Sequence, residues 1–131
     1  MVCLDTTFLV DLLHRMPVAE QKLQELWDRK ESVTTTPINA EELFKGAYRV
    51  SDTEREVRRV KGILAVARLL DVPVEACERY GKLVGDLQSK GEAIGDLDTL
   101  IASIAITHNQ ALLTRNKSHF EKIPGLILES Y

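Results

Sequence analysis

Cysteine is scarce in this sequence of 131 residues, which contains only Cys3 and Cys77. Neither cysteine belongs to a Cys-x-x-Cys pair or has a histidine beside it, and both lie in apolar segments. Cysteines in such surroundings usually behave as small hydrophobic residues. We therefore expect two buried thiols, and neither a disulfide nor a cysteine-bound metal.

Long apolar runs are also absent. No window approaches the roughly eighteen apolar residues that a membrane-spanning helix needs. The N-terminal segment has no basic cluster followed by a long apolar stretch, so it does not predict a secretion signal. These observations predict a cytoplasmic protein without a membrane segment.

An excess of positive charge is the third feature that the sequence lacks. Seventeen Lys and Arg residues oppose twenty Asp and Glu residues, which gives a formal net charge of −3. Domains that hold nucleic acid through bulk charge are usually basic, so that class is disfavoured. A nuclease is not excluded, because acids reserved for metal ions lower the net charge by themselves.

Length and composition fit one globular domain over residues 1–131. Most domains contain about 100–150 residues, and a chain of this size buries roughly two-thirds of its unfolded surface. A hydrophobic content of 44% and a charged content of 28% are ordinary for a globular chain. A disordered or fibrous chain is thereby excluded.

Short apolar or β-branched segments alternate with amphipathic ones along the sequence. Strands are expected at residues 1–5, 32–36, 69–74, 111–114 and 126–128. Helices are expected from Phe8 with Thr6 or Thr7 as cap, after Pro17, from Ala40 past Gly46, and over 53–69, 75–90 and 97–108, the last two ending at Gly91 and Asn109. Strands separated by helices favour a parallel sheet covered on both faces. The predicted fold class is α/β, a three-layer α/β/α sandwich with a short, mostly parallel central sheet.

Acidic residues follow several of the expected strands, and sites in open parallel sheets form at the carboxyl ends of strands. The polar residues at these places are Asp5, Glu42, Asp96, Asp98 and Asn116. Four carboxylates at one edge repel one another unless cations neutralise them. Oxygen ligands favour Mg²⁺ or Mn²⁺ over zinc, and two such ions roughly 3.5–4 Å apart can activate water against a phosphodiester. The pattern predicts a metal site but no particular substrate.

Helical phase distinguishes Asp96 from Asp98, the two acids near the start of the helix expected over residues 97–108. If Asp96 caps the helix, its carboxylate is occupied by backbone N–H groups, and Asp98 in the first turn reaches the sheet edge. Asp98 is therefore the better metal ligand, and Asp96 the better cap or outer acid. Each acid alone also has a purely structural explanation, such as an interaction with a helix dipole. Only their convergence predicts a site.

Four segments of the sequence resemble the conserved blocks of PIN domains, in order and with typical spacing. They are LDTTFLVDLL at residues 4–13, ELFKGA at 42–47, IGDLDTLIAS at 94–103 and LTRNKSHFEKIPGL at 113–126. Each block is a weak signal alone, but together they span nearly the whole chain. Within PIN domains, the sequence most resembles the VapC toxins of prokaryotic toxin–antitoxin pairs.

This resemblance implies a Mg²⁺-dependent endoribonuclease that forms a homodimer and is held inactive by a small VapB-like antitoxin. Carried over residue by residue, Asp5, Glu42 and Asp98 are the core metal-binding and catalytic acids. Thr6 and Thr114 would orient those acids or a bound water. In the working hypothesis, a metal-activated water cuts RNA in line and leaves a 5′-phosphate and a 3′-hydroxyl.

Two positions depart from the family pattern. Thr7 stands where many relatives have Asn, and Asn116 stands where many PIN domains have a fourth aspartate, although Asn is familiar there among VapC-like chains. A neutral Asn116 could order a water or a carboxylate, but it would bind a second metal ion less well. Asp96 or Glu121 could supply the missing charge, so the number of metal ions, one or two, stays open.

RNA binding requires cationic groups near the acids. Arg115 and Lys117 flank Asn116 and are the candidate RNA contacts. A basic run over residues 49–61 could guide the RNA backbone, or it could be a solvated helix face paired with its own glutamates. We expect no catalytic histidine; His119, the one histidine near a motif, is a weaker candidate for RNA contact.

Three alternative functions are weighed against the toxin ribonuclease. A phosphatase of the haloacid dehalogenase type needs an aspartate two residues after Asp5, where this sequence has Thr7. A catalytically weak or silent PIN-fold interaction module is suggested only by Asn116. A PIN nuclease of RNA processing outside a toxin–antitoxin pair has the same acids.

Overall fold

Five short strands form a parallel sheet at the centre of the molecule. In the computed structural model, which describes residues 1–131, the strands are β1 (Val2–Leu4), β2 (Val33–Thr35), β3 (Arg68–Leu69), β4 (Ala111–Leu113) and β5 (Leu128–Glu129). Their order is β3-β2-β1-β4-β5, and every neighbouring pair is parallel. The register pairs Val2 with both Val33 and Ala111, so β1 is the central strand.

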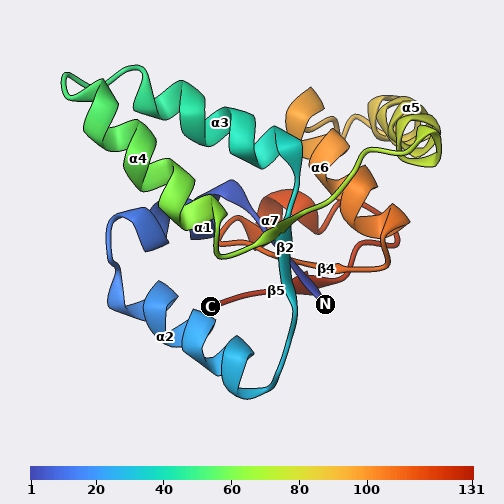
Figure 1. Ribbon diagram of the computed structural model, residues 1–131. Coiled ribbons are helices and arrows are strands. Elements are labelled where there is room, and N and C mark those ends of the chain that lie inside the picture. Colours follow the sequence, from blue (N-terminus) through green and yellow to red (C-terminus); the bar gives the residue numbers. More distant parts are fainter.

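Helices cover both faces of this sheet (Figure 1). They are α1 (Thr6–Leu13), α2 (Pro17–Asp28), α3 (Pro37–Ala47), α4 (Thr53–Leu64), α5 (Val74–Ser89), α6 (Asp96–Thr107) and α7 (Lys117–Phe120). Side chains alternate along each strand, so Val2 and Leu4 join a core with α1 to α4, whereas Cys3 joins a second core with α5 to α7. The predicted α/β/α sandwich is confirmed.

Several predicted boundaries are corrected by the structure. The third strand is only Arg68–Leu69, because it is an edge strand that pairs with β2 alone and the chain leaves the sheet before Pro73. The short helix α7 was not predicted from the sequence. Gly91 and Asn109 follow their helices with positive φ of 67° and 55°, as expected for residues that end a helix.

The two cysteines differ in their surroundings. Cys3 is buried in the sheet, and burial raises the pKa of its thiol to about 12. Cys77 is exposed, which corrects the expectation that both are buried: it lies beside the buried Ala76 on α5, but on the outer face of that helix. None of the helices has the length and apolar character needed to span a bilayer.

Candidate active site

Asp5 lies at the carboxyl end of the central strand and is only 3% exposed. It is the N-cap residue of α1, in place of the predicted Thr6 or Thr7, but its side chain makes no capping bond. Thr114 Oγ1 donates to its Oδ2 at 2.7 Å, and Thr7 Oγ1 donates to the same oxygen at 3.3 Å. Asn39 Nδ2 donates to Oδ1 at 3.3 Å. The side chains that donate to this carboxylate are therefore all uncharged.

Glu42 projects from α3 beside Asp5 and is half-buried. Thr6 Oγ1 donates to its Oε1 at 2.9 Å, so the predicted orienting roles of Thr6 and Thr114 agree with the hydrogen bonds that they make. Burial raises the pKa of Glu42, the bond from Thr6 opposes this, and the charges of Asp5 and Asp98 raise it further. These three acids therefore lie within electrostatic reach of one another.

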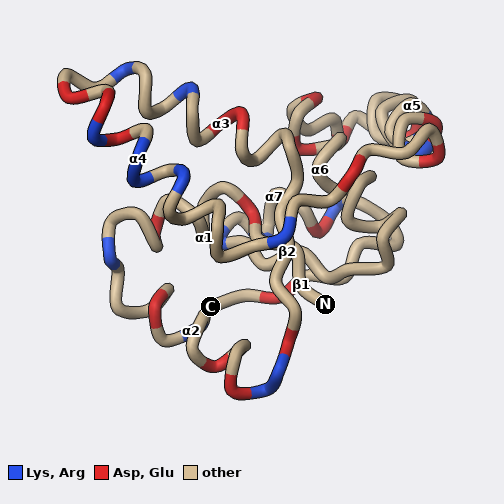
Figure 2. The backbone as a smooth tube through the Cα atoms, viewed as in Figure 1, with Lys and Arg blue, Asp and Glu red and all other residues tan.

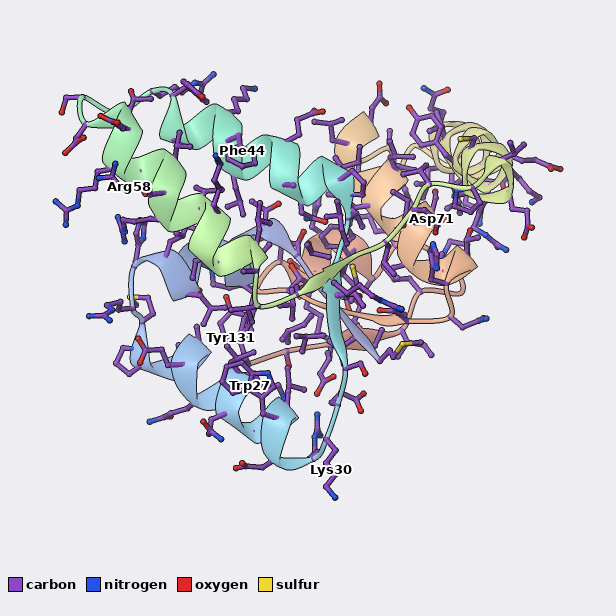
Figure 3. The ribbon with its side chains drawn as sticks, viewed as in Figure 1. Trp27, Lys30, Phe44, Arg58, Asp71 and Tyr131 are labelled. Atoms are coloured by element: carbon purple, nitrogen blue, oxygen red, sulfur yellow. The ribbon has the colours of Figure 1, made fainter.

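Asp98 lies in the first turn of α6 and meets a histidine across the site. Nε2 of His119, on α7, lies 2.8 Å from Asp98 Oδ2. The fold thus brings to an acid the histidine that the sequence had offered only as a weak RNA contact. His108, in contrast, is the C-cap residue of α6 and lies 3.0 Å from the backbone oxygen of Asp71, a position labelled in Figure 3.

Burial dominates the electrostatics of Asp5. It raises the pKa of this carboxyl, the hydrogen bonds from Thr114, Thr7 and the Thr6 backbone lower it in part, and the Asp98 charge raises it again. No Lys or Arg forms an ion pair with Asp5, Glu42 or Asp98. The acids at this edge therefore lie together without a Lys or Arg partner, and the one basic group that contacts them is the His119 imidazole on Asp98.

These acids fit a hard divalent cation by their chemistry. All three offer only oxygen atoms, the donors that Mg²⁺ and Mn²⁺ prefer. No three Asp, Glu, His or Cys side chains are arranged to enclose one ion directly. A divalent cation at this place would therefore be bound directly by one or two of the carboxylates, with water completing its coordination.

The remaining candidate acids are exposed. Asp96 is the first residue of α6, with Gly95 as the cap in place of the predicted Asp96, and it lines a small pocket with Val84 and Gln88 of α5. Glu121 is exposed at the end of α7.

Asn116 belongs to the loop between β4 and α7. Its backbone N–H donates to Thr114 Oγ1 at 3.0 Å, and its side chain is exposed and makes no hydrogen bond. The backbone N–H of Asn116 therefore helps fix the hydroxyl that supports Asp5. Lys117 follows it and is also exposed.

Arg115, a candidate RNA contact, forms an ion pair with Asp11 of α1. Its Nη1 donates to both oxygens of Asp11, at 2.9 and 3.0 Å, and the Tyr131 hydroxyl donates to the same carboxylate. Asp11 is only 5% exposed. Burial and the Asp11 contact raise the pKa of Tyr131 above its usual range. This group joins α1, the loop after β4 and the end of the chain.

Sequence reasoning missed Asp11 and Asn39 as partners of the site. Asp11 interrupts the apolar α1 segment, and a carboxylate on a buried helix face is a signal that a cationic partner exists. Asn39 stands three residues after Thr36, the spacing of a capping box. The first signal could not name Arg115, and the second could not reveal that the same amide reaches Asp5.

The basic run over residues 49–61 is largely a solvated helix face. The basic residues of α4 share the helix with two glutamates in its first turn, and Arg58 points outward from it (Figures 2 and 3). Arg59 pairs with Glu56 at 2.9 Å, and Arg58 lies 3.9 Å from Glu54. The pairing that the sequence analysis offered as the alternative to an RNA surface is thus present for two of the arginines.

Comparison with known proteins assigns the chain to a class. A family model described as the PIN domain matches residues 2–126. The chain therefore belongs to the PIN domain family, as its four sequence segments predicted.

Within this family, the chain is similar in sequence to ribonucleases named VapC. The chain is 31% identical over 128 residues to ribonuclease VapC2 of Rickettsia felis, and the match covers 98% of this chain and 96% of that protein. It is 31% identical over 94 residues to the tRNA(fMet)-specific endonuclease VapC of Salmonella typhimurium, covering 72% of this chain and 71% of the relative.

Solved structures agree with this grouping. VapBC2 from Rickettsia felis, in a crystal structure bound to a DNA fragment from their promoter, matches with a TM-score of 0.92 and 30% identity, covering 100% of this chain and 99% of that one. DNA-bound VapBC from Salmonella typhimurium matches with a TM-score of 0.90 and 26% identity, covering 99% and 98%. The fold is shared over essentially its whole length.

Proposed function

We propose that this chain is a VapC-type toxin, an endoribonuclease that hydrolyses RNA phosphodiester bonds and is inhibited by a VapB-like antitoxin. The observation that carries the proposal is the group of Asp5, Glu42 and Asp98, three acids at one sheet edge with no Lys or Arg to neutralise them. The names of the similar ribonucleases, and the toxin–antitoxin complexes with which the fold is shared, support the same function.

Asp5, Glu42 and Asp98 would hold Mg²⁺, or Mn²⁺ in its place, directly or through its bound waters. A bound divalent cation supplies a coordinated water of lowered pKa and offsets charge on the phosphate. Thr114 and Thr6 fix the Asp5 and Glu42 oxygens through hydroxyl bonds of 2.7 and 2.9 Å. His119 fixes Asp98 from the other side. Asp96 and Glu121 are given no part in the proposed mechanism because both side chains are exposed.

Two cations beside the site would contact the RNA backbone. Lys117 is exposed and free of ion pairs, and the Arg115 side chain is 57% exposed even though Nη1 is bonded to Asp11. Phosphate contacts of this kind position the nucleic acid without reading its sequence. The homodimer implied by the family resemblance and the cytoplasmic location predicted from the sequence belong to this proposal as well.

The decisive experiment is cleavage of a mixed RNA pool by purified protein freed of any partner. We expect cutting with Mg²⁺, none with EDTA, and a loss of about a thousandfold for Asp98→Asn, equivalent to roughly 4 kcal/mol of transition-state stabilisation. Asp86→Asn, which removes the partner of Lys82 on α5, is the matched control and should cut normally. Folded protein that cuts no RNA with Mg²⁺ or Mn²⁺ would instead favour a silent binding module.

A further inference from the structure

Asn39 is a fully buried polar residue in the first turn of α3. Its Oδ1 accepts a hydrogen bond from Thr36 Oγ1 at 2.7 Å and another from the Thr36 backbone N–H at 3.3 Å. Its own backbone N–H donates to Thr36 Oγ1 at 3.2 Å. The helix cap therefore occupies the amide oxygen completely.

Because the oxygen is fixed at the helix cap, the amide nitrogen must point into the acid site. Asn39 Nδ2 donates to Asp5 Oδ1 at 3.3 Å and to Thr6 Oγ1 at 2.9 Å. An Asn amide carries two N–H groups, and each has one acceptor here. No buried side-chain nitrogen or oxygen atom in the protein is left without a partner.

The bond to Thr6 determines the direction of a further bond. A hydroxyl group has one proton, so the Thr6 oxygen, which accepts from Asn39, uses that proton to donate to Glu42 Oε1 at 2.9 Å. One amide thus fixes Asp5 directly and Glu42 through Thr6. These two acids come from different elements, 37 positions apart in the sequence.

We propose that Asn39 is a positioning residue of the site, which holds Asp5 and Glu42 in the mutual arrangement that a divalent cation requires. This role rests on the proposed function. An amide suits it because it supports two carboxylates without bringing a positive charge. A Lys or Arg at this position would neutralise the acids and compete with the cation for them.

The test compares Mn²⁺ binding by the Asn39→Ala and Asn39→Leu variants with binding by wild-type protein. Free Mn²⁺ is measured by electron paramagnetic resonance during the titration. Loss of groups that orient metal ligands typically weakens metal affinity by about 10–100-fold, and we expect a change in this range for both variants. The Leu variant fills the buried volume, so it answers the question if the Ala variant fails to fold.

Asp52→Ala is the matched control. It removes a side-chain helix cap of the same kind, but from α4, where Asp52 accepts from the Arg55 backbone N–H and contacts none of the acids, so Mn²⁺ affinity should stay within about twofold of wild type. With RNA as substrate, the Asn39 variants should lower kcat and leave KM nearly unchanged.

Two results would overturn this role, and they are distinguishable. Folded Asn39 variants that bind Mn²⁺ as wild type does would show that Asn39 serves only the helix cap. Wild-type protein that binds no Mn²⁺ and cuts no RNA would contradict the proposed function itself, and the positioning role with it.

Discussion

Two sets of carboxylates in the protein differ in the side chains that contact them. Asp5, Glu42 and Asp98 meet only hydroxyl, amide and imidazole groups. Glu129 on the edge strand β5 binds Lys22 and Arg29, both at 3.0 Å, and Asp11 on α1 binds Arg115. Both sets are partly or largely removed from water, so the difference lies in their partners and not in their burial.

The pKa values follow this difference. Burial and neighbouring negative charge raise the pKa of Asp5 and Glu42. Burial acts in the same direction on Glu129, but the hydrogen bonds from Lys22 and Arg29 outweigh it and lower the pKa of that carboxyl. Acids that serve the fold are thus neutralised within the chain, whereas Asp5 and Glu42 at the sheet edge have no cationic partner.

The largest expected effect on stability comes from the paired set. Asp11→Asn should lower the free energy of unfolding by about 2 kcal/mol, because it leaves Arg115 without its partner and weakens the bond from Tyr131; the estimate allows for the exposure of Arg115. The thermal midpoint should fall by roughly 6 °C. Asp86→Asn, which breaks an exposed pair, should cost at most about 0.5 kcal/mol. Equal effects of the two substitutions would contradict the comparison.

A smaller effect of opposite sign is expected at the site. Asp5→Asn should stabilise metal-free protein by about 1 kcal/mol at pH 7, since it removes a buried charge with no cationic partner. The folded-state pKa of Asp5 lies above its unfolded value, so its charge destabilises the wild type at pH values above the folded pKa.

The pH dependence of this effect sharpens the comparison. As the pH falls through the folded pKa towards about 3.9, the unfolded value, wild-type Asp5 becomes protonated and the advantage of the Asn variant should disappear. Thermal unfolding of wild type and Asp5→Asn in EDTA measures the stability difference between them at pH 7 and near pH 4. An Asn variant that is less stable than wild type at pH 7 would show that the carboxylate is held favourably without metal.

Much of the fold could be predicted from the sequence because its local patterns agree with its tertiary structure. The apolar run at residues 1–5 is β1, and the stripe at 97–108 is α6 to within one residue at each end. The third strand was overextended, because an apolar segment at a sheet edge looks like a strand even where only two residues pair. Helix α7 is too short to show a helical period.

The candidate site was only partly predictable. Asp5, Glu42 and Asp98 were found because each stands just after a predicted strand or at a helix start, and those positions meet in a parallel sheet. The partners of these acids could not be found in this way. Asn39 contacts Asp5, and His119 contacts Asp98. Which way these side chains point depends on the packing between elements, and no periodic pattern in the sequence reveals it.

The most direct test of the central claim is calorimetric titration of Mg²⁺ into wild type, Asp98→Asn and Asp11→Asn. If the unpaired acids are kept for a cation, wild type and Asp11→Asn should bind Mg²⁺ alike, even though the latter is less stable, and Asp98→Asn should bind at least about tenfold more weakly. Equal binding by the wild type and the Asp98 variant, or no binding by either, would contradict the claim.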